Sequence, residues 1–458
     1  MPTNSERKRD LHKERVLEIT DAVFPQTTYG EIDGERVRMK GGIEGQIVRV
    51  RLKKKGGKKI GKILSVEKPS PVETETPCPA FGRCGGCTFL TVPYEEEAKR
   101  IFLRLLRLYE RELPETKLLD VRFTPAKSRT GYRNKMEYTF GDEVKGGELT
   151  LGLHARGMFH TIVDIDGCTI APRDFETIRK GVEAYFRTRG VKHYHKITHE
   201  GFLRYLVVRE GKYTGDILVR LVTTGDFTVP EGFVPMLTGL ELDGRITGIL
   251  HGMSDSVSDT TRSEREEILY GSPIYEEKLL GLTFEISPES FFQTNSEMAE
   301  VLYRKALETV TDIDDKTVFD FYSGTGTLAQ IFAKKAREVI AVEIVPEAVE
   351  AAKRNAEKNG LENIRFHAAD VKDIIDSIEE VPDLLILDPP REGIHPKAIG
   401  GLIRFGAREI LYISCNPVTQ TRDIGIFEEA GYTLESLEFV DLFPGTPNCE
   451  AIALLRKR

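Results

Sequence analysis

The chain has 458 residues, of which 40% are hydrophobic and 30% are charged. This length predicts about three domains of roughly 150 residues each. No apolar run approaches the roughly 18 residues of a membrane span, and the chain does not open with a signal-peptide pattern. We therefore expect a cytoplasmic protein with no membrane partner and with reduced cysteines.

The charge is unevenly distributed along the chain. The net charge is −8, yet residues 1–70 contain 17 Lys and Arg against 10 Asp and Glu. A basic segment ahead of an acidic body is typical of a small domain that meets a polyanion such as nucleic acid. A solvated lysine run at residues 53–59 explains the same composition, so charge alone leaves both explanations open.

Short β-like segments separated by glycine-rich turns fill residues 15–68. Their size and spacing predict a small β-barrel, and an oligonucleotide-binding barrel with a basic groove is a common solution. The segments are residues 15–20, 35–40, 46–52 and 59–66.

Three further regions follow the barrel. Proline-rich residues 69–80 predict a linker, and residues 95–112 predict an amphipathic helix with an acidic first turn. Residues 125–280 are mostly strand-like and predict an α+β domain. From about residue 315, apolar strands alternate with helices, which indicates a doubly wound α/β domain. Its expected strands are residues 318–321, 339–342, 364–366, 384–387 and 410–413.

The turn after the first of these strands predicts a nucleotide-like cofactor. Residues 320–327 read Asp-Phe-Tyr-Ser-Gly-Thr-Gly-Thr, and Glu343 ends the next strand, where a carboxylate can accept ribose hydroxyls. The turn lacks the third glycine of a dinucleotide site and the Gly-Lys-Ser/Thr of a phosphate loop. This favours S-adenosylmethionine, with Gly324 beside it and Asp370 near the adenine, over ordinary turn chemistry.

Two later strands end in turns that carry chemical groups. The segment Asp388-Pro-Pro-Arg391 holds a carboxylate rigidly at the crevice. Arg391 stands where amino methyltransferases carry an aromatic residue, so nitrogen methylation is disfavoured. Cys415 lies just past the fifth strand, and Pro417 prevents that strand from continuing. Taken alone, such a cysteine is more often a small buried hydrophobe.

Together these segments resemble the RNA uracil-C5 methyltransferase family, most closely its iron–sulfur members that modify 23S ribosomal RNA. The resemblance implies that Cys415 is the nucleophile and that Glu450 is the general base. Asn448 and Cys449 depart from the family pattern just before that base. The matching pieces are residues 287–295, 320–327, 388–393, 413–417 and Glu450, and the cofactor residues implied are Gln293, Tyr322, Glu343 and Asp388.

The expected chemistry explains these residue types. Carbon 5 of uracil is a poor nucleophile until a thiolate adds to carbon 6, and a thiolate is also a workable leaving group. A carboxylate must then remove the proton from carbon 5. The target base has to leave its stack to reach such a pocket.

Four other cysteines form a separate group, Cys78-x5-Cys84-x2-Cys87 with a distant Cys168. Four thiolates suit zinc or an iron–sulfur cluster, although this is not the usual zinc spacing. In the family that it resembles, the pattern marks members with a [4Fe–4S] cluster, which we expect here.

The resemblance also implies a division into domains. We expect a TRAM-like RNA-binding barrel at 10–69, a central α+β iron–sulfur domain at 70–280, and a class I methyltransferase domain at 281–458. The helix at 95–112 would pack on the catalytic domain. Residues 131–135 (Gly-Tyr-Arg-Asn-Lys) either contact RNA or support the following strand.

The sequence therefore predicts a monomeric enzyme that methylates carbon 5 of a uridine in RNA. The expected substrate is 23S ribosomal RNA, with the T-loop uridine of tRNA as the alternative. A non-catalytic RNA-binding protein with the same fold is a further alternative.

Overall fold

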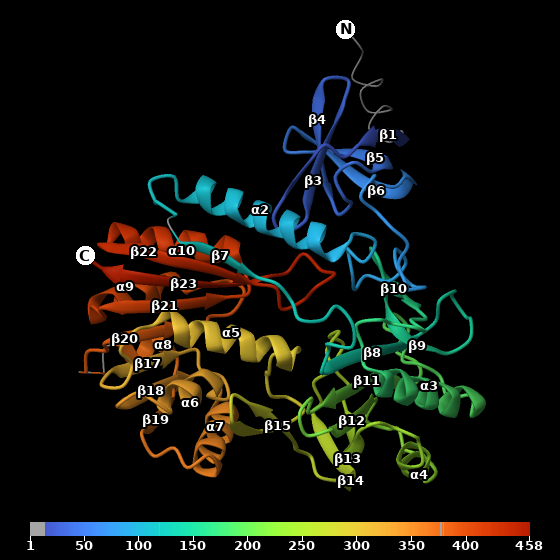
Figure 1. Ribbon diagram of the computed structural model, residues 1–458. Helices are drawn as coiled ribbons and strands as arrows, with labels where there is room; N and C mark the ends of the chain where they lie inside the picture. Colours follow the sequence, from blue (N-terminus) through green and yellow to red (C-terminus); the bar gives the residue numbers. More distant parts are fainter. Residues whose placement is uncertain (1–13, 119, 376–377, 379) are drawn as a thin grey trace. The chain divides into compact units, whose positions relative to one another are not determined.

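The computed structural model describes residues 14–118, 120–375, 378 and 380–458 (Figure 1). The chain forms two compact units, each built from several segments. The first unit takes its described residues from 1–76, 87–117 and 443–449, and the second from 77–86, 118–442 and 450–458. The expected domain boundaries at 10–69, 70–280 and 281–458 stay a prediction.

A six-stranded sheet forms most of the first unit, in the order β1-β5-β6-β4-β3-β2. Neighbouring strands are antiparallel except for β4 and β6. Strand β1 also contacts β3, far from it in this order, so the sheet curls around an aliphatic core. The strands are β1 (Glu14–Glu18), β2 (Asp21–Val23), β3 (Thr27–Ile32), β4 (Glu35–Lys40), β5 (Ile47–Lys55) and β6 (Lys58–Lys68).

A tight hairpin carries the lysine run of this sheet. Lys55 pairs with Lys58, so only Gly56 and Gly57 form the turn, with φ of 56° and 78°. A two-residue turn of this kind needs left-handed backbone, which glycine adopts without strain. The run is therefore held on two paired strands, and the lysines at 53–55 and 58 are exposed.

Helix α2 (Tyr94–Glu112) completes the first unit. The buried Arg104 lies 2.5 Å from the Glu44 carboxylate of the segment before β5. The fully buried Glu97 accepts a hydrogen bond from the backbone N–H of Gly445. These contacts explain why the late segment 443–449 belongs to the same unit as the N-terminal sheet.

A seven-stranded sheet occupies the central part of the second unit, in the order β10-β9-β8-β11-β12-β13-β14. It is antiparallel except between β12 and β13. Helices α3 (Arg173–Thr188) and α4 (Phe233–Thr238) pack on each other and on this sheet. The strands are β8 (Lys135–Gly141), β9 (Thr150–Ala155), β10 (Met158–Val163), β11 (Leu203–Glu210), β12 (Asp216–Thr223), β13 (Arg245–Met253) and β14 (Arg265–Gly271).

An eight-stranded sheet forms the rest of the second unit, in the order β19-β18-β17-β20-β21-β23-β22-β7. The first five strands in this order are parallel, and β23 runs antiparallel to β21. The chain builds outward from β17 in both directions, so β17 and β20 flank a topological switch point, where such sheets bind ligands. The strands are β7 (Val121–Thr124), β17 (Thr317–Phe321), β18 (Glu338–Glu343), β19 (Ile364–Ala368), β20 (Leu384–Leu387), β21 (Glu409–Ser414), β22 (Tyr432–Val440) and β23 (Glu450–Lys457).

Helices connect and cover the strands of this sheet, and one hairpin, β15–β16, packs against α5, α7 and β12 (Figure 1). Helix α6 contacts β17 and β18, while α10 contacts β21 and β22. No helix among the described residues is both long and apolar enough to cross a membrane. The elements are β15 (Tyr275–Leu279), β16 (Leu282–Ile286), α5 (Ser296–Thr309), α6 (Thr327–Ala333), α7 (Pro346–Lys358), α8 (Val371–Ile374), α9 (Pro396–Phe405) and α10 (Pro417–Glu429).

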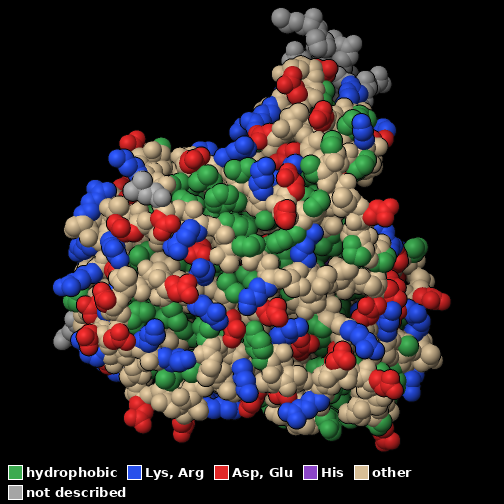
Figure 2. Space-filling model, viewed as in Figure 1, with side chains coloured by type: hydrophobic (Ala, Val, Ile, Leu, Met, Phe, Trp, Pro, Cys, Tyr) green, Lys and Arg blue, Asp and Glu red, His purple; other side chains and the backbone are tan. Residues whose placement is uncertain are grey.

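The predicted α/β fold with a β-rich N-terminal part is confirmed. Each of the five strands expected after residue 315 is present, displaced by at most two residues at an end. On the face drawn in Figure 2, the Lys and Arg side chains of the second unit are interspersed with Asp and Glu side chains.

Candidate active site

Cys415 occupies the junction between a buried strand and a helix. All six residues of β21 are buried, and α10 begins at Pro417. The N-cap Asn416 accepts a hydrogen bond from the Val418 N–H and donates its own N–H to Ser414 Oγ at 3.0 Å. The half-buried Cys415 therefore lies at the positive end of a helix, and this one feature of its surroundings favours a thiolate.

Glu450 is the first residue of the neighbouring strand β23 and lies beside Cys415. Strands β21 and β23 are antiparallel and Ser414 pairs with Ala451, so the next residues outward are Cys415 and Glu450. The Glu450 side chain is buried, and burial, with a smaller contribution from the Asp388 charge, raises its pKa to about 8. A carboxyl group with such a pKa readily takes up a proton near neutral pH.

Asp388 follows β20 on the other side of the nucleophile. Leu387 pairs with Tyr412 of β21, which brings the two strand ends together. Burial raises the pKa of Asp388 to about 7. Burial and the charges of Glu450 and Asp388 also raise the pKa of Cys415 to about 11. Asp388 and Glu450 are therefore close enough to Cys415 to oppose its ionisation, and Asp388 is close enough to Glu450 to raise its pKa.

Arg391 is the cation of this cluster. Its side chain hydrogen-bonds to Cys415, and its charge lowers the pKa of both Cys415 and Glu450. Its carbonyl accepts hydrogen bonds from Asn416 Nδ2 at 2.7 Å and from Thr419 Oγ1 at 3.2 Å. The Pro-Pro turn is thus tied to the nucleophile turn. The sequence argument used Arg391 only to exclude amino methylation and missed this contact.

The expected cofactor turn has a constrained backbone. Tyr322, Gly324 and Gly326 have φ of 67°, 55° and 73°. A Cβ on Gly326 would lie 2.9 Å from Phe366, whereas a Cβ on Gly324 would meet open space. Gly326 is needed for packing, while the space beside Gly324 is available to a ligand. A left-handed tyrosine is unusual and is typical of functional turns.

Two predicted acidic residues face this turn. Glu343 accepts hydrogen bonds from the N–H groups of Gly324 and Val345, both at 2.9 Å, which leaves carboxylate lone pairs for a ligand. Asp370 caps α8 and pairs with Lys372 Nζ at 2.7 Å, and this hydrogen bond lowers its pKa. Burial, reinforced by the charge of Asp370, raises the pKa of Tyr322 to about 12.

Two further residues escaped the sequence argument. Asp320 is completely buried, and within the described residues neither carboxylate oxygen has a well-formed hydrogen bond. Burial and the nearby Asp388 raise its pKa. The buried Tyr303 of α5 hydrogen-bonds to the predicted cofactor residue Gln293, and burial, with the charges of Asp388 and Glu450, raises its pKa. An acidic residue inside an apolar strand was the available signal for Asp320. Tyr303 instead follows an ordinary helical core pattern.

Comparisons with known proteins show the family to which this chain belongs. The family model described as tRNA (Uracil-5-)-methyltransferase matches residues 261–458. An uncharacterized RNA methyltransferase of Clostridium tetani (strain Massachusetts / E88) is 42% identical over 451 residues, which cover 97% of this chain and 98% of that protein. The chain belongs to the RNA uracil-5 methyltransferase family. It is therefore an enzyme.

Two other relatives extend the similarity of this uracil-5 methyltransferase. An uncharacterized RNA methyltransferase of Clostridium acetobutylicum is 43% identical over 444 residues, covering 96% of this chain and 97% of that protein. The crystal structure of Pyrococcus abyssi tRNA (uracil-54, C5)-methyltransferase in complex with S-adenosyl-L-homocysteine matches with a TM-score of 0.77 and 26% identity. It covers 96% of this chain and 99% of that chain.

The uracil-5 methyltransferase uses S-adenosylmethionine, and its crevice fits a cationic ligand of that kind. Open space lies beside Gly324, and among the described residues the buried Asp320 carboxylate has only a weak backbone contact, from Ala329, to compensate its burial. A buried carboxylate in this state is costly unless a ligand supplies a donor or a positive charge.

The four predicted cluster cysteines are divided between the two units. Cys78, Cys84 and Cys168 belong to the second unit and pack against its central core, while Cys87 belongs to the first. Burial raises the pKa of Cys168, and Cys78 and Cys84 lie near enough to raise it further. Among the described residues, no three His, Cys, Asp or Glu side chains are grouped so as to hold a metal ion. The cluster stays a prediction.

Proposed function

We propose that this methyltransferase modifies carbon 5 of a uridine in RNA, with Cys415 as nucleophile and Glu450 as general base. One observation carries the proposal. Cys415 follows the last residue of β21, Glu450 is the first residue of the adjacent strand β23, and Arg391 contacts the thiol beside them. A nucleophile, a proton acceptor and a cation are the groups that this reaction needs in one place.

Cys415 acts first. Its thiolate adds to carbon 6 of uracil, and the ring electrons shift so that carbon 5 becomes nucleophilic. Without a ligand, burial and two carboxylates oppose ionisation of the thiol, whereas Arg391 favours it. S-adenosylmethionine supplies the electrophilic methyl group, which carbon 5 takes from the sulfonium.

Glu450 completes the reaction. Its carboxylate accepts the proton from carbon 5, the electron pair of that C–H bond restores the ring double bond, and the bond between carbon 6 and the Cys415 sulfur breaks. Asp388, on the neighbouring strand end, orients the thiol or the ring. The base must be flipped out of its stack to reach this crevice.

The residues proposed to hold the cofactor lie in the turn at residues 320–327 and around it. Glu343 would accept the ribose hydroxyls with the lone pairs that its two amide contacts leave available. The space at Gly324 admits the ligand next to the backbone, and Asp370 lies on the adenine side. Gln293, Tyr322 and Asp388 complete the proposed set.

We propose 23S ribosomal RNA as the substrate, because the cysteine pattern and the basic N-terminal sheet resemble the enzymes that modify it. A TRAM-like role for that sheet in RNA binding belongs to the same proposal. The second candidate is tRNA, because the Pyrococcus abyssi enzyme, which matches along almost the whole chain, is a tRNA (uracil-54, C5)-methyltransferase.

A [4Fe–4S] cluster on Cys78, Cys84, Cys87 and Cys168 is also proposed, with a structural role because the methyl transfer needs no electron. Three of these thiols lie against one core, and four thiolates are a suitable ligand set. Anaerobically purified protein should then contain about four iron and four sulfide per chain. Protein that lacks both, or that binds stoichiometric zinc, would contradict the cluster.

The activity is tested by incubating the protein with methyl-labelled S-adenosylmethionine and unmodified RNA. Label should enter carbon 5 of uridine, and Cys415→Ala should abolish the transfer. Full activity of that variant would refute the assignment of the nucleophile. Mass mapping of uridines in ribosomal and transfer RNA, from cells with and without the gene, distinguishes the two substrates.

A further inference from the structure

Another buried carboxylate, that of Glu277, lies outside the reaction centre, beside the segment that carries Gln293. Glu277, in β15, is fully buried. It accepts hydrogen bonds from the backbone N–H groups of Lys212 at 2.8 Å and Tyr213 at 3.1 Å, and from the Ser296 hydroxyl. A buried carboxylate of this kind is retained only where several donors compensate its desolvation.

Ser296 connects Glu277 to residues 293–295, which carry Gln293 and which we call the cofactor segment. Asn134 Nδ2 donates to Ser296 Oγ and to the Gln293 carbonyl, both at 2.8 Å. Asn134, Ser296 and Gln293 are all buried. The chain Glu277–Ser296–Asn134, which we name the Glu277 network, therefore ends on the backbone of Gln293.

The same segment is fastened at two further points. Arg133 Nη1 donates to Thr294 Oγ1 at 2.9 Å, and the Asn134 N–H donates to the Thr294 carbonyl at 3.0 Å. Tyr132 and Asn134 are themselves buried. Residues 131–135 thus support the cofactor segment, which favours the structural alternative over an RNA contact.

Two sets of contacts fix Gln293: the Glu277 network holds its backbone, and a contact from α5 holds its side chain. Ser296 is the first residue of α5, and the buried Tyr303 on the same helix hydrogen-bonds to Gln293. A buried polar network satisfies its groups in one arrangement only, whereas apolar packing tolerates several. The segment is therefore held in a single geometry from two sides.

We propose that the Glu277 network is a positioning device for S-adenosylmethionine: Glu277, Ser296 and Asn134 hold Gln293 in the geometry that binds the cofactor without touching it. The inference rests on the proposed function, in which Gln293 is a cofactor residue. Because the carboxylate also holds the Lys212–Tyr213 turn between β11 and β12, the network joins the central sheet to the cofactor segment.

Isothermal titration of the full chain with S-adenosylmethionine tests this positioning role. Ser296→Ala and Glu277→Gln should each weaken binding about tenfold, as expected when one buried hydrogen bond that orients a binding group is lost. The double variant should bind no more weakly than the poorer single variant, because both changes break the same network. The KM for S-adenosylmethionine should rise while the KM for RNA stays unchanged.

Thr309→Ala is the matched control, because it removes a hydroxyl at the far end of the same helix, bonded to the Lys305 carbonyl. Its affinity should equal that of the wild type. A lower melting temperature with wild-type affinity in Ser296→Ala and Glu277→Gln would mark structural support alone and overturn the inference. Gln293→Ala separates the two proposals. If Gln293→Ala binds S-adenosylmethionine weakly while the network variants bind it normally, only the positioning inference is overturned. If Gln293→Ala binds it normally, the assignment of Gln293 as a cofactor residue is wrong as well.

Discussion

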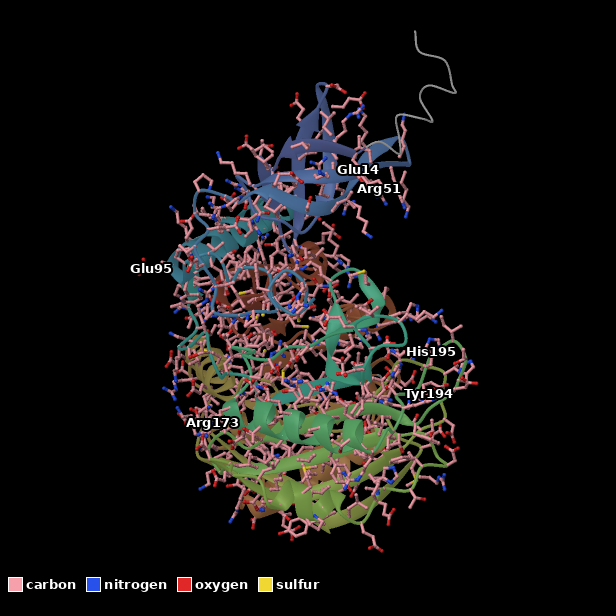
Figure 3. The ribbon with its side chains drawn as sticks, turned by 90° about the vertical axis from the view of Figure 1, so that its right-hand side faces the viewer. Glu14, Arg51, Glu95, Arg173, Tyr194 and His195 are labelled. Atoms are coloured by element: carbon pink, nitrogen blue, oxygen red, sulfur yellow. The ribbon has the colours of Figure 1, made fainter. Side chains whose placement is uncertain are left out.

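The charges of the N-terminal sheet and those of the catalytic crevice are arranged in opposite ways. On the sheet, acidic and basic side chains pair in the open, as Glu14 and Arg51 do at 3.1 Å on neighbouring strands (Figure 3). In the crevice, Asp388 lies near both Asp320 and Glu450, and burial raises the pKa of all three acids. The cation Arg391 lies near Glu450.

The difference separates two uses of charge. Exposed ion pairs contribute little to stability, because water and salt screen them. Such side chains can exchange partners with a phosphate backbone at low cost. Buried carboxylates of like charge hold protons that they would lose in water, and they favour a cationic ligand. The open ion pairs of the sheet suit the external polyanion proposed for it, and the buried acids of the crevice suit the bound cation and the proton transfer proposed there.

The largest expected effect comes from replacing the proposed general base. Glu450→Gln should lower turnover by about 10²–10⁴-fold, because the amide cannot accept the carbon-5 proton. The covalent bond to Cys415 then cannot break, so an RNA adduct should accumulate that survives denaturing electrophoresis. Normal turnover without an adduct would show that another group is the base.

Glu435→Gln is the matched control for that variant. Glu435 lies on the neighbouring strand β22 with an exposed side chain, 3.9 Å from Arg456. Its replacement removes the same charge from the surface of the same sheet. Turnover should remain at the wild-type level, and no adduct should form.

The sequence predicted more of the strand framework than of the side-chain network. Buried parallel strands and their turns are local patterns, and residues 410–413 lie within β21 as expected. Strand β14 lies in the region expected to be mostly strand, but its bounds could not be predicted because its side chains are mostly exposed and lack an apolar alternation. The residues of the proposed active site came from strand-end chemistry and from family resemblance, and their roles remain to be tested.

Contacts between distant segments could not be read from local patterns. Asn134 donates a hydrogen bond to the carbonyl of Gln293, 159 positions away in the sequence, and no sequence pattern near either residue indicates this contact. Tyr303 and Glu277 follow ordinary core and strand patterns, so their polar partners become visible only in three dimensions. The pairing of Ser414 with Ala451 likewise depends on the antiparallel return of β23, which brings Glu450 to the nucleophile.

A second prediction removes the cation from the crevice. Arg391→Leu should slow methyl transfer by about 10–100-fold at neutral pH, because the Cys415 thiolate loses its hydrogen-bond donor and nearby charge. The defect should shrink as the pH is raised, since hydroxide then ionises the thiol. The exposed Arg365 pairs with Glu338 on the surface, and Arg365→Leu should leave the pH–rate profile unchanged. A pH-independent defect in Arg391→Leu would argue against this role.

A third prediction concerns stability. The pKa of Glu450 is about 8 in the folded chain and about 4.3 in an unfolded one, so the folded state binds the proton more tightly. Its contribution to stability is present below about pH 4 and is lost as the pH rises through about 8. Glu450→Gln does not titrate, so between pH 6 and 9 its melting temperature should fall by a few degrees less than that of the wild type. If the melting temperatures of the two proteins change in parallel over this pH range, the Glu450 carboxyl of the wild type is ionised throughout it.

The smallest effect is expected on the exposed side of the comparison. Lys54 is exposed on β5, within the lysine run. If it meets a phosphate, Lys54→Ala should weaken RNA binding by a factor of about three and reduce the slope of log affinity against log salt by about one. Lys353→Ala, on the exposed face of α7 beside Glu350, removes the same charge elsewhere and should change neither value. Equal losses of RNA affinity in both variants would mean that binding depends only on the total charge of the protein. A loss confined to Lys54 would mean that the phosphates follow the N-terminal sheet, because the variants differ only in where the charge is removed.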